Sequence, residues 1–440
     1  MFQIKMLSMK RSKIISIVVF ILFTKMAIGQ NINYFFIDDI YQRSYFNPAL
    51  NDEGKISISS GLGADFITNG PSINDFIIDG PTGNLILSPA NAIASMNDVN
   101  DLYGYSSVNT FDASVNLPFF RVSIGHAWKA NGWMSYTKDL ANFVTFGNGP
   151  FVGETLNLGP QIDYINYNEL YLGIQKSFGP LSIGVRAKRL NGVEAIKTEN
   201  STIDLTTSSD IYQLTLETDF EMMSSNAFNY TDIDDFDLNI QNFSFDNFFS
   251  NNGGWAFDLG ASLSVGDRLE LSLSVLDIGS INWDVDPKKY SSKEIQTFEG
   301  IDIANYINSD DEIVILDSIE SLLKISESSA EFSTTLPTQI YLGGRFKISD
   351  LWTVGAIIQS VGNGDRRANV IGFNATANLY NWLSAGVLYS IKTGNPANFG
   401  LSLKTQLGPV IGFLSTDNIL NAGTFDGKNS NFRAGLNLRI

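Results

Sequence analysis

Apolar and polar side chains alternate along most of this chain, and the clearest example runs from residue 255 to residue 275. From Trp255 to Val265 every odd position is apolar or alanine, and every even position is small or polar. After the turn Gly266-Asp267-Arg268 the alternation resumes, with Leu269, Leu271, Leu273 and Val275 on one side. A period of two is typical of a β-strand with two different faces. Similar segments recur up to the final residue, Ile440.

The pattern predicts an up-and-down meander of about fourteen strands, within a range of about 12 to 18. Residues 69–107 and 224–250 are predicted to be loops, residues 140–165 irregular, and residues 194–222 two longer polar strands that extend beyond the membrane. Residues 302–329 break the pattern, because apolar residues recur there at helical spacing, which predicts an amphipathic helix. The regular strands are predicted at 55–67, 111–117, 120–128, 133–138, 170–178, 181–187, 255–265, 269–277, 340–348, 352–358, 371–379, 385–391, 397–403 and 432–440.

A soluble β-sandwich would also alternate, but three features favour an all-β transmembrane antiparallel barrel. Aromatic residues gather near strand ends, as at membrane interfaces. The segments run for about ten residues, the length that a tilted strand needs to cross a bilayer, whereas soluble strands have about five or six. Charged residues occupy the polar parity within strands, where they would face a polar lumen. These candidate lumen-facing charges are Arg186, Lys188, Asp258, Glu270, Arg345 and Lys347. The four cations, Arg186, Lys188, Arg345 and Lys347, could bind an anion, but structural pairing with Asp258 and Glu270 is favoured.

The first 29 residues have the composition of a signal peptide. Lys10, Arg11 and Lys13 precede a short apolar core, and Ala27-Ile28-Gly29 is a small-residue cleavage site. Nothing after residue 30 approaches the length of a transmembrane helix. The predicted organisation is therefore a signal peptide (1–29), a lead-in that is a candidate plug for the lumen (30–54) and an outer-membrane barrel (55–440).

Composition excludes several classes of function. The chain has no cysteine, which removes disulfide frameworks and thiolate metal sites. Its formal net charge of −17 argues against binding nucleic acid. The one histidine, His126, has no nucleophile and acid arranged around it in the sequence, so no enzymatic activity is predicted. Asp232, Asp234, Asp235 and Asp237 lack the glycine and closing glutamate of a calcium loop and indicate a solvated loop. No cofactor and no metal are predicted.

Four stretches carry a resemblance to a known family: Ser44 to Leu50, Gly253 to Trp283, Leu336 to Gly343, and Asp417-Asn418. In this order they resemble a family of Bacteroidetes outer-membrane barrel proteins of unknown function, related in style to the PorP/SprF-type proteins of gliding and type IX secretion. The resemblance implies a signal peptide and a single barrel, and it brings no catalytic residues. More distantly, the lead-in is similar to that of FadL-type transporters of hydrophobic compounds, in which such a segment plugs the lumen.

Two functions are open from the sequence. The first is passage or delivery of a small ligand, for which a hydrophobic compound is one candidate, across the outer membrane. The alternative is a non-conducting structural or interaction platform for a secretion, gliding or surface complex. The expected partners are outer-membrane lipid, the barrel-assembly machinery, and periplasmic or secretion-complex proteins, with no nucleic acid.

Overall fold

The computed structural model describes residues 32–50, 54–79, 84–210, 213–230, 236–241, 252–298, 324–363, 366–392, 395–420 and 428–440. Three predicted features lie wholly or partly outside these residues: the signal peptide, the aspartates Asp232, Asp234 and Asp235, and most of the predicted helix at 302–329. None of the helices in these ranges is long and apolar enough to cross a membrane.

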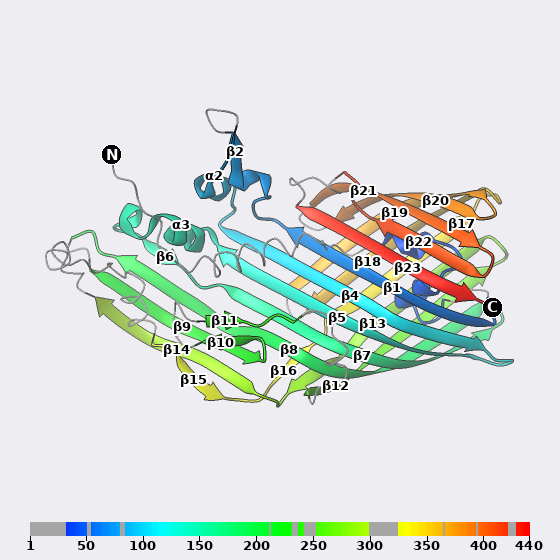
Figure 1. The fold of residues 1–440 in the computed structure, drawn as a ribbon, viewed down its shortest axis with the longest axis horizontal. Helices are drawn as coiled ribbons and strands as arrows, with labels where there is room; N and C mark the ends of the chain where they lie inside the picture. Colours follow the sequence, from blue (N-terminus) through cyan, green and yellow to red (C-terminus); the bar gives the residue numbers. More distant parts are fainter. Residues whose placement is uncertain are drawn as a thin grey trace.

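Within the described residues, fourteen antiparallel strands close into a barrel (Figure 1). Each strand pairs with the next along the wall, and the first and last are joined by eleven residue pairs from Ser57–Arg439 to Ile67–Asn429. The fold class predicted from the sequence is therefore confirmed. The wall strands are β1 (Ile56–Thr68), β4 (Val99–Asn116), β5 (Arg121–Thr137), β7 (Gln161–Phe178), β8 (Leu181–Thr207), β12 (Asn252–Val265), β13 (Leu269–Trp283), β17 (Thr338–Lys347), β18 (Trp352–Asn363), β19 (Arg366–Tyr380), β20 (Leu383–Lys392), β21 (Asn395–Leu407), β22 (Val410–Thr416) and β23 (Asn429–Arg439).

The two faces of the wall differ as the alternation requires. Leu259 on the outer face is 50% exposed, whereas its neighbour Asp258 on the inner face is 1% exposed. Leucine, isoleucine, valine and phenylalanine are exposed on the outside of every side of the barrel, from Leu62 on β1 to Leu436 on β23. A continuous apolar belt of this size needs an apolar surrounding, which is the hydrocarbon of a bilayer.

The two ends of the barrel also differ. In the described part of the chain, six hairpin turns of two to four residues lie at one end, together with Ile56 and Ile440; we call this the turn end. The longer connections lie at the opposite end, which we call the loop end. There β8 continues past the wall and pairs with β9 (Leu214–Ser225), which pairs with β14 (Pro287–Phe298). With β6 (Thr155–Asn157), β15 (Ser326–Ser329) and α3 (Lys138–Phe146), these strands form a lobe that projects from one side, at the left of Figure 1.

Several sequence predictions need correction at element boundaries. The predicted loop 69–107 contains α2 (Pro89–Ala94) and the start of β4, and the predicted strands 120–128 and 133–138 are both parts of β5. The irregular segment 140–165 contains most of α3, β6 and the start of β7. The last residues of the predicted helix, Ser326–Ser329, form a strand. The sequence prediction missed β22 because Ile411 and Phe413 are apolar on its inner face, which hides the alternation.

The lead-in lies inside the barrel at the turn end, visible as the blue coil near the C-terminus in Figure 1. It forms two short 3-10 helices, η1 (Asn33–Phe36) and η2 (Tyr41–Tyr45), and nearly all of its described side chains are buried. Its apolar residues pack against Tyr341, Ile357, Val370, Leu388, Ile411 and Phe413 of the inner wall. Most apolar side chains of the wall face outward, so the lead-in supplies most of the apolar core inside the barrel.

Candidate functional site

The lead-in is bound to the inner wall along its whole length by polar contacts. Asp417 accepts hydrogen bonds from the backbone N–H groups of Ile32 (2.9 Å) and Asn33 (3.1 Å). At the other end, the amide of Asn47 donates to the carbonyl oxygens of Ala261 (2.8 Å) and Leu273 (3.1 Å). Each contact satisfies a polar group that is buried away from water, so the lead-in is fixed in register against the wall.

Ion pairs fix the middle of the lead-in. Arg345 of β17 binds Asp38, and Arg43 binds Glu270 of β13. Burial alone would raise the pKa of Asp38, but the positive charges of Arg345 and Arg43 outweigh it and lower that pKa below the usual value of a carboxyl. Asp38 therefore stays ionised at neutral pH and holds the lead-in to the wall.

Glycines of the inner wall leave room for the lead-in. A Cβ atom on Gly343 would lie 2.7 Å from Cζ of Phe35, and one on Gly355 would lie 2.6 Å from Cε1 of Phe36. Both phenylalanines are 1% exposed and lie at 86° to each other in an aromatic cluster, so neither has space to retreat. The glycines are therefore needed for close approach of lead-in and wall rather than for backbone flexibility.

Gly343→Ala is expected to destabilise the barrel by about 1–3 kcal/mol, because the added methyl group overlaps the ring of Phe35. The free energy of unfolding in denaturant, measured in lipid vesicles, checks this. Gly412→Ala is the matched control, since its Cβ atom would lie 3.5 Å from the nearest atom. Equal stability of the two variants would contradict the tight packing of the lead-in.

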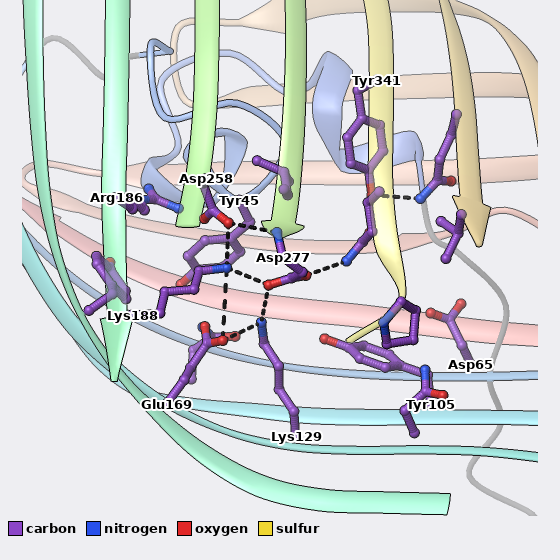
Figure 2. A pocket seen from close by; sticks show the side chains of 18 of the residues that line it. Tyr45, Asp65, Tyr105, Lys129, Glu169, Arg186, Lys188, Asp258, Asp277 and Tyr341 are labelled. Atoms are coloured by element: carbon purple, nitrogen blue, oxygen red, sulfur yellow. Dashed lines mark hydrogen bonds and ion pairs between the residues drawn. The ribbon is translucent and has the colours of Figure 1, made fainter. Parts of the chain in front are cut away.

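A cavity of about 90 Å³ lies in the lumen on the loop side of the lead-in (Figure 2). This volume holds several water molecules. The lining is strongly polar, with seven tyrosines and eight charged residues, four cationic and four acidic. The tyrosines are Tyr34, Tyr45, Tyr103, Tyr105, Tyr167, Tyr171 and Tyr341; the charged residues are Asp65, Lys129, Glu169, Arg186, Lys188, Asp258, Asp277 and Arg433.

Five of these charged side chains form one ion-pair cluster. The ammonium nitrogen of Lys188 lies 2.8 Å from Oδ1 of Asp258 and 2.5 Å from Oδ1 of Asp277. Lys129 lies 2.8 Å from Oε2 of Glu169 and 3.9 Å from Asp277. In Figure 2 both lysines point toward Asp277 from different strands. The five residues come from β5, β7, β8, β12 and β13, so the cluster ties one side of the wall together.

A β-bulge brings Asp277 into the cluster. The register between β12 and β13 shifts between Phe257–Ile278 and Leu259–Val275, which leaves Leu276 and Asp277 together opposite Asp258. Asp277 has a φ of 59°, and both bulged residues are buried on the inside. Because the bulge adds one residue, the alternation shifts by one position and Ile278 points outward, where it is 42% exposed. A bulge that re-aims a side chain in this way is a common device at functional sites of β-sheets.

A tyrosine network continues the polar interior toward the lead-in. The hydroxyl of Tyr171 donates to Asp112 (2.5 Å), that of Tyr45 donates to the same carboxylate, and Tyr41 and Tyr171 share a hydrogen bond of 2.8 Å. Arg186 lies over the ring of Tyr171, 4.7 Å from its centroid, and donates to Oγ of Ser44 (2.7 Å). The lead-in is therefore part of the cavity lining and not only its floor.

The structure places the sequence-predicted charges in three locations. Arg186, Lys188 and Asp258 line the cavity. Arg345 and Glu270 lie closer to the turn end, where they bind Asp38 and Arg43 of the lead-in. Lys347 has the inward parity of Arg345 but lies at the rim, where it is half exposed and paired with Asp350 of the following turn. Sequence reasoning missed Lys129, Glu169 and Asp277, although the first two flank predicted strand boundaries.

An apolar layer lies on the loop side of the cavity, against the wall strands β8, β12 and β13. Leu190 follows Lys188 on β8, Ala256 precedes Asp258 on β12, and Trp283 follows Asp277 on β13; all three are 0% exposed. Leu336 completes this layer and is 2% exposed. From the turn end, this side of the lumen therefore presents the lead-in, the charged cavity and the apolar layer, in that order.

With this architecture established, a model of the family of unknown function DUF5723 is found to match residues 48–417. The chain belongs to this family. Comparison with curated proteins finds no match. Among solved structures, a TodX mutant monoaromatic hydrocarbon channel is 10% identical, with 90% of this chain and 94% of that chain covered and a TM-score of 0.47. The Ralstonia pickettii toluene transporter TbuX is also 10% identical, with 95% and 96% covered and a TM-score of 0.44.

Proposed function

We propose that this member of the DUF5723 family is an outer-membrane barrel that controls the passage of a small polar ligand, with residues 32–50 as its plug. In outer-membrane barrels the short turns face the periplasm. This orientation puts the lead-in at the periplasmic mouth and the lobe outside the cell. The main support for the proposal is that the lead-in is bound across the lumen, with a charged cavity next to it on the side of the loop end.

The cavity lining favours a polar ligand over the hydrophobic candidate suggested by the sequence. Its eight charged groups balance in sign, and its tyrosine hydroxyls and amides offer hydrogen bonds on several sides. An apolar ligand at this position would displace bound water without satisfying these buried polar groups, which costs free energy. A neutral molecule with many donors and acceptors replaces that water at little cost.

Single-channel recording in planar bilayers tests the plug. The intact mature protein is expected to conduct no ions. Deletion of residues 32–50 is expected to produce steady ion conductance, because it removes the residues that fill the half of the lumen nearest the turn end. The deletion variant must first show the shift in gel mobility on heating that is characteristic of folded barrels. A folded deletion variant that stays closed would refute the plug, and so would steady conductance of the intact protein.

The lobe favours a second candidate function, a platform for an external or secretion partner. It extends β8 beyond the wall and has its own small core, in which Leu156, Leu205 and Leu216 are each at most 3% exposed. A pore does not require a sheet with its own core outside the membrane, so the lobe indicates a role in binding a partner. Co-purification of one partner with the intact protein, lost on removal of the lobe, would support this role.

A further inference from the structure

An aromatic strip on β4 and β5 continues the cavity toward the loop end. Tyr105 pairs with Asn131 across the two strands, and Tyr103 pairs with Trp133 one step farther from the turn end. Residues opposite each other in an antiparallel pair share a face. Tyr103, Tyr105 and Asn131 line the cavity, so Trp133 also points into the lumen. All four side chains are partly exposed, whereas the apolar layer on β8, β12 and β13 is fully buried. The open side of the lumen therefore lies along β4 and β5.

Hydrogen bonds to the wall hold the polar ends of the two outer rings of this strip. Nδ2 of Asn131 donates to the hydroxyl of Tyr103 at 2.8 Å. Nε1 of Trp133 donates to Oδ1 of Asp101 at 3.1 Å. The two rings lie at 76° to each other with their centroids 6.3 Å apart, so they do not stack on each other. The strip therefore places fixed aromatic rings, and not only polar groups, beside the path of a ligand.

The ion pairs of the cavity favour an uncharged ligand with hydroxyl groups. Lys188 is paired with Asp258 and Asp277, and Lys129 is paired with Glu169. A charged ligand would have to displace one of these partners, and breaking a buried ion pair costs several kcal/mol. A hydroxyl group both donates and accepts, so it can bond to a paired carboxylate or ammonium group without separating the pair. At about 15 Å³ for each molecule, the cavity of about 90 Å³ holds about six water molecules, which is the volume that one monosaccharide displaces.

We propose that the cavity and the aromatic strip bind a neutral pyranose sugar. The hydroxyl groups of the sugar bond to the paired charges of the cavity, and an apolar C–H face of its ring lies on the rings of Tyr103, Tyr105 and Trp133. An acyclic polyol has the hydroxyl groups but no rigid apolar face, and a charged sugar has no unpaired partner of opposite charge to meet. This assignment names the ligand of the proposed passage, so it rests on the proposed function.

Saturation-transfer NMR of the intact mature protein tests this site, in an amine-oxide detergent that carries no sugar. The probes are the methyl glycosides of glucose, galactose and mannose, together with sorbitol and the charged methyl glucuronoside. Saturation of the protein's aromatic protons is expected to reach the ring C–H protons of at least one neutral glycoside. That glycoside is expected to bind at least tenfold more tightly than sorbitol or the glucuronoside.

Substitutions in the strip locate the bound sugar. Tyr103→Leu and Trp133→Leu each remove a ring but keep an apolar side chain, and each is expected to weaken glycoside binding at least fivefold. Trp382→Leu removes an exposed tryptophan at the turn end and is the matched control, which is expected to bind as the intact protein does. Gel mobility on heating verifies that each variant is folded.

Four outcomes would overturn the proposal: no binding of any neutral glycoside, equal binding of sorbitol, equal or tighter binding of the glucuronoside, and unchanged binding by both strip variants. The conductance measurement on the plug is independent of these. An intact protein that binds no glycoside, with a deletion variant that conducts, would remove the sugar and leave the passage. A protein that binds the glycoside, with a folded deletion variant that stays closed, would leave the sugar site and remove the passage.

Discussion

Lys188→Met is expected to lower the free energy of unfolding of the barrel by about 3–5 kcal/mol. Lys188 is 4% exposed and is the cation closest to both Asp258 and Asp277. Methionine matches the lysine stem in length but leaves Asp258 buried without its counter-charge, and the cost of that orphaned charge dominates the loss. Equilibrium unfolding of the protein in lipid vesicles measures the change.

Two further variants separate the orphaned charge from a simple loss of packing. Lys188→Met combined with Asp258→Asn is expected to be more stable than Lys188→Met alone, since the second change removes the buried charge that the first leaves unpaired. Lys293→Met breaks an ion pair of 2.7 Å with Asp219 on the exposed surface of the lobe and is expected to have little measurable effect. A double variant less stable than the single variant would show that the cluster does not act through charge balance.

The cluster explains how this barrel remains stable while its apolar side chains face outward. In a soluble protein those side chains would form the core, but here they contact the acyl chains of the bilayer. Two substitutes occupy the interior: the lead-in, whose aromatic residues form an inserted apolar core, and the ion-pair cluster, which links five strands. Both act between strands that are far apart in the sequence, so both favour one closed arrangement over open sheets.

The sequence was sufficient for the wall because one rule, alternation, governs it. That rule predicted the outward belt, the short turns and the inward parity of Arg186, Lys188, Asp258 and Arg345. It failed where a second partner changes the inner face. Ile411 and Phe413 are apolar because they contact the lead-in, so β22 lost its alternation and was missed. Residue period alone carries no information about what fills the lumen.

The candidate site was predictable only in part for a similar reason. Asp277 lies on the outward parity of β13 if the strand is regular, and only the bulge at Leu276 and Asp277 turns it inward. Lys129 fell in the gap between two segments that the structure joins into β5. Which charges meet depends on the order of strands around the barrel, and β8 and β12 are neighbours in space although a long connection separates them in the sequence.

Leu259→Arg is expected to destabilise the barrel by about 2–4 kcal/mol, the cost of a cation at the middle of the bilayer. Leu259 lies midway between Trp255 and Leu263 among the outward residues of β12, and it is 50% exposed. Leu271 is close to the turn end, so Leu271→Arg is expected to cost less, because its side chain can reach the interface. Unfolding in lipid vesicles measures both changes.

Ile295→Arg on β14 of the lobe supplies the control for this depth series. Ile295 is 68% exposed, more than Leu259, yet it lies on the lobe beyond the belt. If water surrounds the lobe and lipid surrounds the belt, arginine changes stability at Ile295 by no more than about 0.5 kcal/mol. Equal costs at the two positions would mean that the same medium covers both surfaces, and the outer face of the barrel would then need an explanation other than the bilayer.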